Sequence, residues 1–412
     1  MPGSTTTTRI IEQDIPLRNN LRASSGVVTF TRATSAWAED DAGVVQSYAT
    51  NIPRISPTKG LFVEGVRINV QTNNAAMNLW TRPFGVTGSA DTADTLDPLG
   101  TNTAEKIVED GTTLAHGMDN GAMTTMSGSS YVVSCYLKKG TRDWFRLNAA
   151  GGAAGNVWFN ITTLATGSTP GAGITNVTLR AVQNGWVRIS AVFGKDEFFT
   201  GTSKFFGVYH ATGDNNINFT GTVNDYFYAW GFQAESVSTF LGGYPSTPII
   251  TCAAAVQRNL ESNSFSLFGS AREGTISLKF TPNVRQADWL AGVNMTLIDT
   301  CQAGGEDGVL FYFEDFRDGI LSFYFADGGV GTTSINTAAL TWTVGVTYSV
   351  SCTWSRGRAL CYRNGVLVAS NVTGNVRIPT TYATAVKPSI GMSPGTTWQC
   401  DGYVHDVRVS RI

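Results

Sequence analysis

Few acidic residues of this chain are spaced so that one carboxylate could act as an acid and another as a base. Hydrolysis of a glycosidic bond needs two carboxylates about 5–10 Å apart, one on each side of the sugar. The stretch nearest to such a pattern is Glu314-Asp315-Phe316-Arg317-Asp318, but its spacing is wrong and Gly319 follows it, which is typical of a turn between two strands. No G-x-S-x-G segment supplies a serine nucleophile. The sequence therefore predicts a protein that is not an enzyme.

Trp, Arg and Asn side chains on either side of residue 150 are better candidates for a function, namely binding a sugar. Two segments, 143–148 and 157–162, alternate between apolar residues and polar or aromatic ones. Successive side chains of a strand point to opposite faces, so each segment has one apolar face and one mixed face. The mixed face carries Trp144, Arg146 and Asn148 in the first segment and Trp158 and Asn160 in the second.

The stretch 149–155, rich in Gly and Ala, can join these two segments as a hairpin. Pairing about its centre places Trp158 beside Arg146 and diagonal to Trp144. A Trp ring stacks on the C–H face of a pyranose while polar neighbours bind its hydroxyls, so the cluster is a candidate carbohydrate-binding site. The alternative is that this face packs against another strand or a neighbouring subunit, because Trp and Arg also mark protein interfaces.

Residues that bind metal ions form no clear pattern. The three histidines lie far apart, and the six cysteines include no C-x-x-C spacing, so a zinc site is not expected. Asp299, Asp318 and Asp327 could supply oxygens to calcium, which prefers carboxylates and carbonyls from loops. Acids in solvated turns explain them better. We expect no cofactor, and a structural calcium ion is the alternative left open.

Short strands must position these residues. Alternating runs rich in Val, Ile, Phe, Tyr, Thr and Trp are separated by Gly, Asn, Asp or Ser, which is typical of β-sandwich proteins. The clearest runs are Tyr131–Lys138, Val157–Thr162, Trp186–Phe193, Tyr226–Gln233, Thr275–Phe280, Tyr348–Trp354 and Val404–Val409. We predict an all-β protein with two antiparallel β-sandwich or jelly-roll domains after a small N-terminal attachment segment.

Charge and hydropathy limit the partners. The 412 residues include 29 Lys and Arg against 31 Asp and Glu, whereas binding to nucleic acid needs a basic surface. No stretch approaches the ~18 apolar residues of a membrane helix. The segment Met1–Thr8 has neither the basic head nor the apolar run of a secretory signal. We expect neither nucleic-acid binding nor membrane insertion, and either a signal outside this sequence or exit from the cell by a route such as lysis.

Breaks in the pattern divide the chain into four parts. Residues 1–25 are polar and patternless and are predicted to form an N-terminal arm, which is either disordered or docks onto a partner. Residues 26–76 form a compact segment with short strands. A larger domain covers 77–258, and the turn-rich stretch Gly242–Pro248 lies near its end. The last domain covers 259–412.

Motifs within residues 26–76 resemble an N-terminal module of tailed-bacteriophage virion proteins. They are Thr29–Ala36 (TFTRATSA), Asn51–Arg54 (NIPR) and Gly60–Asn69 (GLFVEGVRIN). The module has an FTRAS strand, an N-x-P-R turn and a GLLIE…RTN segment in this order. Ile68 stands where Thr is usual.

The rest of the chain resembles two domains that occur in such proteins. Residues 77–258 resemble a carbohydrate-binding-module-like jelly roll. The segments that carry this resemblance are Ser134–Gly140, Gly185–Arg188, Ala229–Glu235 and Ala255–Arg258. Residues 259–412 resemble a concanavalin-A-like (laminin-G-like) sandwich. The segments that carry this resemblance are Gly274–Ile276, Trp342–Trp354, Tyr362–Gly365 and Asp401–Arg408.

The resemblance implies a structural component on the outside of a bacteriophage particle: a tail fibre or spike, a head fibre or a capsid decoration. Such a component displays glycan-binding-type domains for adhesion to the host surface. The resemblance also implies localisation in the virion, a homotrimer, docking of the N-terminal region onto other virion proteins, and a host cell-surface glycan as ligand. The alternative is a secreted or surface-displayed bacterial carbohydrate-binding protein.

Large aromatic residues and two cysteines are expected in the cores. Trp186, Trp230, Trp342 and Trp354 are predicted to be buried. A turn at Arg356-Gly357 places Cys352 opposite Cys361 in a hairpin, with Cα atoms about 4.5 Å apart. Both sulfurs then lie in the core, and a virion protein folds in a reducing cytosol. We predict two adjacent, buried, reduced thiols that act as small apolar fillers.

Overall fold

The computed structural model describes most of the chain and shows an all-β protein. The described residues are 11–15, 28–40, 44–80, 82–89, 91–120, 130–149, 155–168, 173–194, 205–237, 243–259, 261–265, 272–289, 291–301, 308–327, 331–377, 388–393 and 399–411. Helical elements within these ranges are single 3-10 turns such as η2 (Met77–Leu79). No helix there is long and apolar enough to cross a membrane. The chain divides into two compact units.

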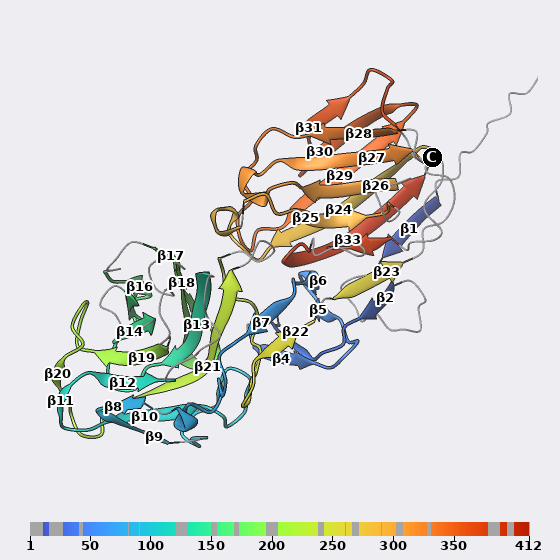
Figure 1. The fold of residues 1–412 in the computed structure, drawn as a ribbon. Coiled ribbons are helices and arrows are strands. Elements are labelled where there is room, and N and C mark those ends of the chain that lie inside the picture. Colours follow the sequence, from blue (N-terminus) through green and yellow to red (C-terminus); the bar gives the residue numbers. More distant parts are fainter. Residues whose placement is uncertain are drawn as a thin grey trace, which may run out of the picture. The chain divides into compact units, whose positions relative to one another are not determined.

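The first unit, formed by Met1–Thr34, Ala49–Val66 and Asn259–Ile412, is a sandwich of two antiparallel sheets (Figure 1). One sheet has the order β31-β30-β29-β24-β33-β6-β5, and β1 also pairs with β33; the other has the order β28-β27-β26-β25-β32. The rings of Phe280 and Phe313, whose centroids are 6.4 Å apart, pack between the sheets. The strands of this unit are β1 (Ile11–Ile15), β5 (Arg54–Ser56), β6 (Gly60–Val63), β24 (Gly274–Pro282), β25 (Met295–Asp299), β26 (Gly308–Phe313), β27 (Leu321–Asp327), β28 (Gly331–Asn336), β29 (Tyr348–Ser355), β30 (Arg358–Arg363), β31 (Val366–Asn371), β32 (Ser389–Ile390) and β33 (Gly402–Arg411), with β2 (Val28–Thr31) and β23 (Ser262–Phe265) as a separate pair.

The hairpin of β29 and β30 has the predicted register. Every second residue of β29 is buried, as expected for a strand with one face on a core. Arg356 and Gly357 adopt left-handed φ values of 48° and 72°, which suits the tight turn of a two-residue hairpin. Cys352 pairs directly with Cys361, and the two buried Sγ atoms lie 3.0 Å apart. The register and the burial are confirmed, and the reduced state in solution stays a prediction.

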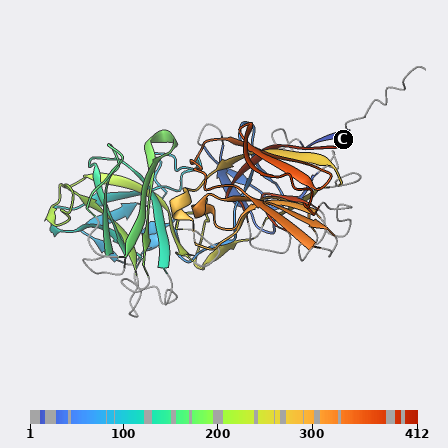
Figure 2. The same cartoon turned by 90° about the horizontal axis from the view of Figure 1, so that it is seen from above.

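The second unit, formed by Ser35–Tyr48 and Arg67–Arg258, is also a sandwich of two antiparallel sheets, whose strands appear in cyan and green in the turned view (Figure 2). One sheet has the order β17-β18-β13-β21-β10-β9, to which β7 and β22 attach; the other has the order β16-β15-β14-β19-β12-β8. The core between them includes Val133 and Ile189 from the first sheet and Phe145 and Phe159 from the second. The strands are β7 (Arg67–Asn69), β8 (Arg82–Phe84), β9 (Val86–Ser89), β10 (Glu105–Glu109), β12 (His116–Asp119), β13 (Ser130–Lys138), β14 (Trp144–Ala149), β15 (Asn156–Asn160), β16 (Ala165–Thr166), β17 (Ile174–Ala181), β18 (Trp186–Phe193), β19 (Phe206–Ala211), β21 (Tyr226–Val237) and β22 (Val256–Arg258), with the small pairs β3 (Ala36–Glu39) with β4 (Val45–Tyr48) and β11 (Thr113–Leu114) with β20 (Phe219–Thr220).

The sheet that contains β13 is covered on its outer face as well. Trp186 and Trp230 cluster there with Tyr136. The segment 91–104 packs over them: Trp186 Nε1 donates to the Leu96 carbonyl at 2.9 Å, and Trp230 Nε1 donates to Thr103 Oγ1 at 2.9 Å. The four tryptophans predicted to be core residues, which include Trp342 and Trp354 in the first unit, are all buried.

Residues 26–76 are not grouped by themselves in this fold. The parts up to Thr34 and from Ala49 to Val66 belong to the first unit, and the remainder belongs to the second. The expected patternless arm also contains a strand, because β1 pairs with the C-terminal half of β33. Pairing between strands so far apart in sequence leaves no local pattern. The sequence therefore indicated neither the division of residues 26–76 between the two units nor the strand β1.

Candidate functional site

The outer face of the six-stranded sheet carries the residues predicted to bind a sugar. Strands β14 and β15 pair so that Arg146 lies opposite Trp158, and Trp144 lies opposite Asn160. This is the predicted hairpin register, which is therefore confirmed. Phe145 and Leu147 point into the core between the sheets, so Trp144, Arg146 and Asn148 point to the other face.

A single row of side chains crosses this face through five strands. Phe84 on β8 lies opposite Gly117 on β12, which lies opposite Tyr209 on β19. Tyr209 in turn lies opposite Arg146, and Arg146 lies opposite Trp158. A Cβ on Gly117 would come within 2.5 Å of Cδ1 of Tyr209, so only glycine leaves room for the tyrosine ring to lie across the sheet. The row therefore brings aromatic rings and one guanidinium side by side across the sheet.

Arg146 is held between aromatic rings. Its Cζ atom lies 4.2 Å from the ring centroid of Tyr209 and 6.0 Å from that of Trp158, distances at which a guanidinium is attracted to a ring face. The Tyr209 hydroxyl donates to Oδ2 of Asp119 at 3.0 Å. Burial lowers the pKa of Arg146 to about 10, although Tyr209 and Asp119 act in the opposite direction. The guanidinium is still charged at neutral pH.

Three buried polar atoms of the face have no hydrogen-bond partner among the described residues. They are Nε1 of Trp158, Nε of Arg146 and Oδ1 of Asn148. The amide nitrogen of Asn148 is satisfied, since it donates to Oδ1 of Asn156 at 2.7 Å. Buried donors and acceptors nearly always have partners in native proteins, and leaving one unpaired costs about 1–3 kcal/mol. Two unpaired donors and one unpaired acceptor thus lie close together on neighbouring strands.

The face differs from an open platform of two stacked tryptophans. Trp158 is only 1% exposed, so its ring is not open to solvent, whereas Trp144 is partly exposed beside Gly167. Asn160 Oδ1 accepts from the backbone N–H groups of Thr162 and Thr163, and this bonding shapes the turn after β15. The structure thus brings the five predicted residues onto one face, and their role in binding stays a prediction.

Four further residues complete the face and were not predicted from the sequence: Phe84, Gly117, Asp119 and Tyr209. They come from three strands that precede or follow the hairpin by many residues. Each strand shows only ordinary alternation, so no local signal marks these residues as neighbours of Arg146.

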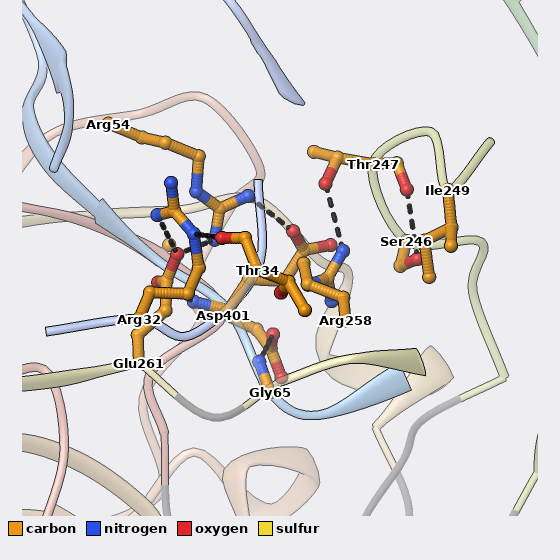
Figure 3. A network of polar contacts seen from close by, with 12 residues as sticks. Arg32, Thr34, Arg54, Gly65, Ser246, Thr247, Ile249, Arg258, Glu261 and Asp401 are labelled. Carbon is orange, nitrogen blue, oxygen red and sulfur yellow. Dashed lines mark hydrogen bonds and ion pairs between the residues drawn. The ribbon is translucent and has the colours of Figure 1, made fainter. Parts of the chain in front are cut away.

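The motifs that carry the resemblance in residues 26–76 have structural contacts. Glu261 Oε1 accepts from Arg32 NH1 at 3.0 Å and lies 2.6 Å from Arg54 NH2, and Arg54 NH1 donates to Glu64 at 2.7 Å (Figure 3). All four side chains are buried. Burial lowers the pKa of Arg54, but the charges of Glu261 and Glu64 raise it overall. In the first unit these arginines and acids therefore bind parts of the chain that are far apart in sequence.

The acidic residues considered for catalysis or calcium binding occupy structural positions. The stretch around Asp315 is the predicted turn between β26 and β27, and the Asp315 side chain accepts from the backbone N–H of Arg317. Asp299 is buried, accepts from the Cys301 N–H and the Ser393 hydroxyl, and has a pKa raised by its burial. Within the described part of the chain, no three His, Cys, Asp or Glu side chains are placed to hold a metal ion.

Comparison with known proteins finds a family model that matches the C-terminal part of the chain. Residues 257–412 match the model of the concanavalin A-like lectin/glucanases superfamily. No curated protein matches the chain. The concanavalin A-like, all-β architecture predicted for this region is therefore confirmed.

Solved structures show only weak similarity. The Ruminococcus gnavus IT-sialidase CBM40 bound to α2,6-sialyllactose is 11% identical, with a TM-score of 0.28, over 34% of this chain and 77% of that chain. The heptameric SAP-like pentraxin of Limulus polyphemus is 16% identical, with a TM-score of 0.26, over 34% and 64%. Tailspike protein 2 of the Escherichia coli O157:H7 bacteriophage CAB120 is 9% identical, with a TM-score of 0.27, over 36% and 21%. Similarity at this level says nothing about the ligand or partner of the present chain.

Proposed function

We propose that this protein is a non-catalytic carbohydrate-binding protein and that its glycan site is the outer face of the six-stranded sheet. The observation that carries the proposal is the group of unpaired buried atoms on Trp158, Arg146 and Asn148. A sugar hydroxyl donates one hydrogen bond and accepts others, so hydroxyls of a saccharide that enters between these side chains can satisfy both donors and the acceptor. Removing the cost of unpaired groups contributes to affinity.

The aromatic residues of the face suit the apolar side of a sugar. Trp144 is partly exposed next to this polar group, and its ring can stack on the C–H groups of a pyranose. Binding sites for small ligands commonly combine aromatic walls with a few polar groups that fix orientation. Support for the function is therefore the chemistry of this face rather than any carboxylate pair.

We further propose that the chain acts on the outside of a bacteriophage particle as a homotrimer, attached by its N-terminal region to other virion proteins. Support is the resemblance of residues 26–76, 77–258 and 259–412 to virion domains. Single glycan sites bind weakly, and display of several linked copies raises avidity without new contacts. A secreted or surface-displayed bacterial protein would use the same face.

Glycan binding is tested by applying the full-length chain to an array of bacterial surface polysaccharides and measuring affinities for the ligands found. Trp144→Ala is expected to weaken binding about tenfold or more. Trp158→Phe keeps an aromatic ring but removes the indole N–H, and is also expected to weaken binding. Val223→Ala, at a side chain 63% exposed and outside the face, is the control. Unchanged binding in both site variants, or no binding by the wild type, contradicts the proposal.

The location is tested separately by immunogold electron microscopy of phage lysates with an antibody against this chain. Labelled particles and a trimer mass by light scattering are the expected results. Label on bacterial cells or in particle-free supernatant would instead favour the bacterial alternative. A stable monomer in solution contradicts the trimer.

A further inference from the structure

Arg146 is a partly buried cation without an acidic partner among the described residues. No carboxylate in the described part of the chain forms an ion pair with it, although its flanking residues are fixed by the sheet. Arg142, which lies shortly before Arg146 in the chain, shows how such a charge is usually compensated. Its guanidinium pairs with Glu109 at 2.7 Å and with Asp225 at 3.0 Å. A buried charge is costly unless it is paired and hydrogen-bonded.

The nearest carboxylate, on Asp119, does not supply the missing partner. The Tyr209 hydroxyl donates to Oδ2 of Asp119 at 3.0 Å. Asp119 acts on the guanidinium through its charge and forms no ion pair with it. The Nε atom of Arg146 is buried and has no hydrogen bond, so one edge of the planar guanidinium carries an unused donor.

A carboxylate is the best geometric match for that edge. Its two oxygens accept parallel hydrogen bonds from Nε and a terminal nitrogen of arginine. The neutral donor of Trp158 lies directly across the strand pair, where it can serve a hydroxyl of the same ligand. An anionic group would therefore be held by charge while the rest of the sugar is held by neutral groups.

We propose that the saccharide bound at this face carries a carboxylate, as in uronic or nonulosonic acids, and that Arg146 pairs with it. This inference rests on the proposed glycan site and specifies its ligand class. Arg146 is then the specificity-determining residue, and Trp144, Trp158 and Asn148 bind the remainder of the sugar.

The test compares acidic glycans with matched neutral ones. The probes are a hexasaccharide of alternating glucuronic acid and N-acetylglucosamine, an oligogalacturonate, sialyllactose, acidic capsular polysaccharides, and the carboxyl-reduced form of each. Full-length wild-type protein is expected to bind at least one acidic probe about tenfold or more tightly than its reduced form. Salt screens charge interactions, although less for a partly buried pair than for an exposed one, so binding of the acidic probe is also expected to weaken modestly between low and high ionic strength.

Variants of Arg146 assign the preference to this residue. Arg146→Gln is expected to reduce affinity for the acidic probe about tenfold or more and to leave affinity for the reduced probe nearly unchanged. Arg146→Lys keeps the positive charge but loses the two parallel N–H donors of the guanidinium. Its affinity for the acidic probe is expected to lie between those of the wild type and Arg146→Gln. Arg180→Gln is the matched control. Arg180 is an exposed arginine on β17, in the sheet that does not carry the candidate site, and it pairs with Glu39. Melting curves establish that each variant is folded.

The outcomes separate this inference from the glycan site itself. Equal binding of acidic and reduced probes by the wild type, with weakening by Trp144→Ala, overturns the acidic specificity but keeps the site. An acidic preference that persists in Arg146→Gln assigns it to another residue and also overturns the inference. Absence of binding to every probe overturns both proposals. If Arg146→Gln does not fold, the wild-type comparison and Arg146→Lys decide.

Discussion

Replacing Glu261 by Gln is expected to destabilise the first unit strongly. The Glu261 carboxylate contacts two buried guanidinium groups, with Oε1 3.0 Å from Arg32 NH1 and 2.6 Å from Arg54 NH2. Its Oε2 also accepts from the backbone N–H of Glu64 at 3.2 Å. Glutamine is nearly the same size, so the substitution changes charge more than shape.

The magnitude follows from the charges that remain. Without the charge of Glu261, the buried Arg32 and Arg54 each lose an anionic contact, and Arg54 keeps its contact with Glu64. Removing one partner of a buried ion pair typically costs about 3–5 kcal/mol because an uncompensated charge stays in the interior. We expect the free energy of unfolding of this unit to fall by an amount in that range.

Hydrogen exchange measured by mass spectrometry assigns the loss to this unit. Amides in β24 and β29, central strands of its larger sheet, are expected to exchange faster, and urea unfolding should show a transition at lower denaturant. The control is Lys279→Gln, which removes a surface pair between Lys279 and Asp406, both more than 30% exposed. Surface pairs contribute about 0–1 kcal/mol. A loss for Glu261→Gln no larger than that of the control would refute the reasoning.

Three further predictions concern titratable groups. Burial raises the pKa of Glu105 from the ordinary 4.5 to about 7, so the stability of the second unit falls as pH rises from 4.5 to 7 and levels off above 7. Glu105→Gln should be more stable than wild type at pH 8.5, by at most about 3 kcal/mol, and equal to it at pH 4 in urea titrations. Burial would raise the pKa of Glu109, but Arg142 and His210 lower it to about 2 from the ordinary 4.5. The stability it contributes should be lost as pH falls from 4.5 towards 2, and thermal melts of Glu109→Gln should lack that step. Titration of the denatured, unreduced protein should find all six thiols; finding four would show that Cys352 and Cys361 are oxidised.

Local patterns were sufficient to predict the fold class and two hairpins. Alternation of apolar residues decides which face of a strand is buried, as the residues of β29 illustrate. A short turn fixes the register of the two strands it joins, because pairing proceeds outward from the turn. This is why the sequence predicted Cys352 opposite Cys361 and Arg146 opposite Trp158, both found in the structure.

Only the tertiary structure brings Tyr209, Gly117 and Phe84 into one row with Arg146. The strands that carry these residues are far from the β14–β15 hairpin in sequence, and no local pattern indicates that they pair with it. The strands beside the hairpin could therefore not be predicted from its residues. The same holds for Glu261, which follows Arg32 by 229 positions yet accepts a hydrogen bond from its guanidinium.

Burial of side chains was likewise decided by segments distant in sequence. Trp186 and Trp230 lie on the outer face of their sheet and are buried because the segment 91–104 packs over it. Alternation assigns a residue to a face but does not reveal whether another segment covers that face. For this protein the sequence determined the strands, their faces and the local hairpins, whereas the tertiary structure decided which faces are covered and which residues meet on the candidate glycan site.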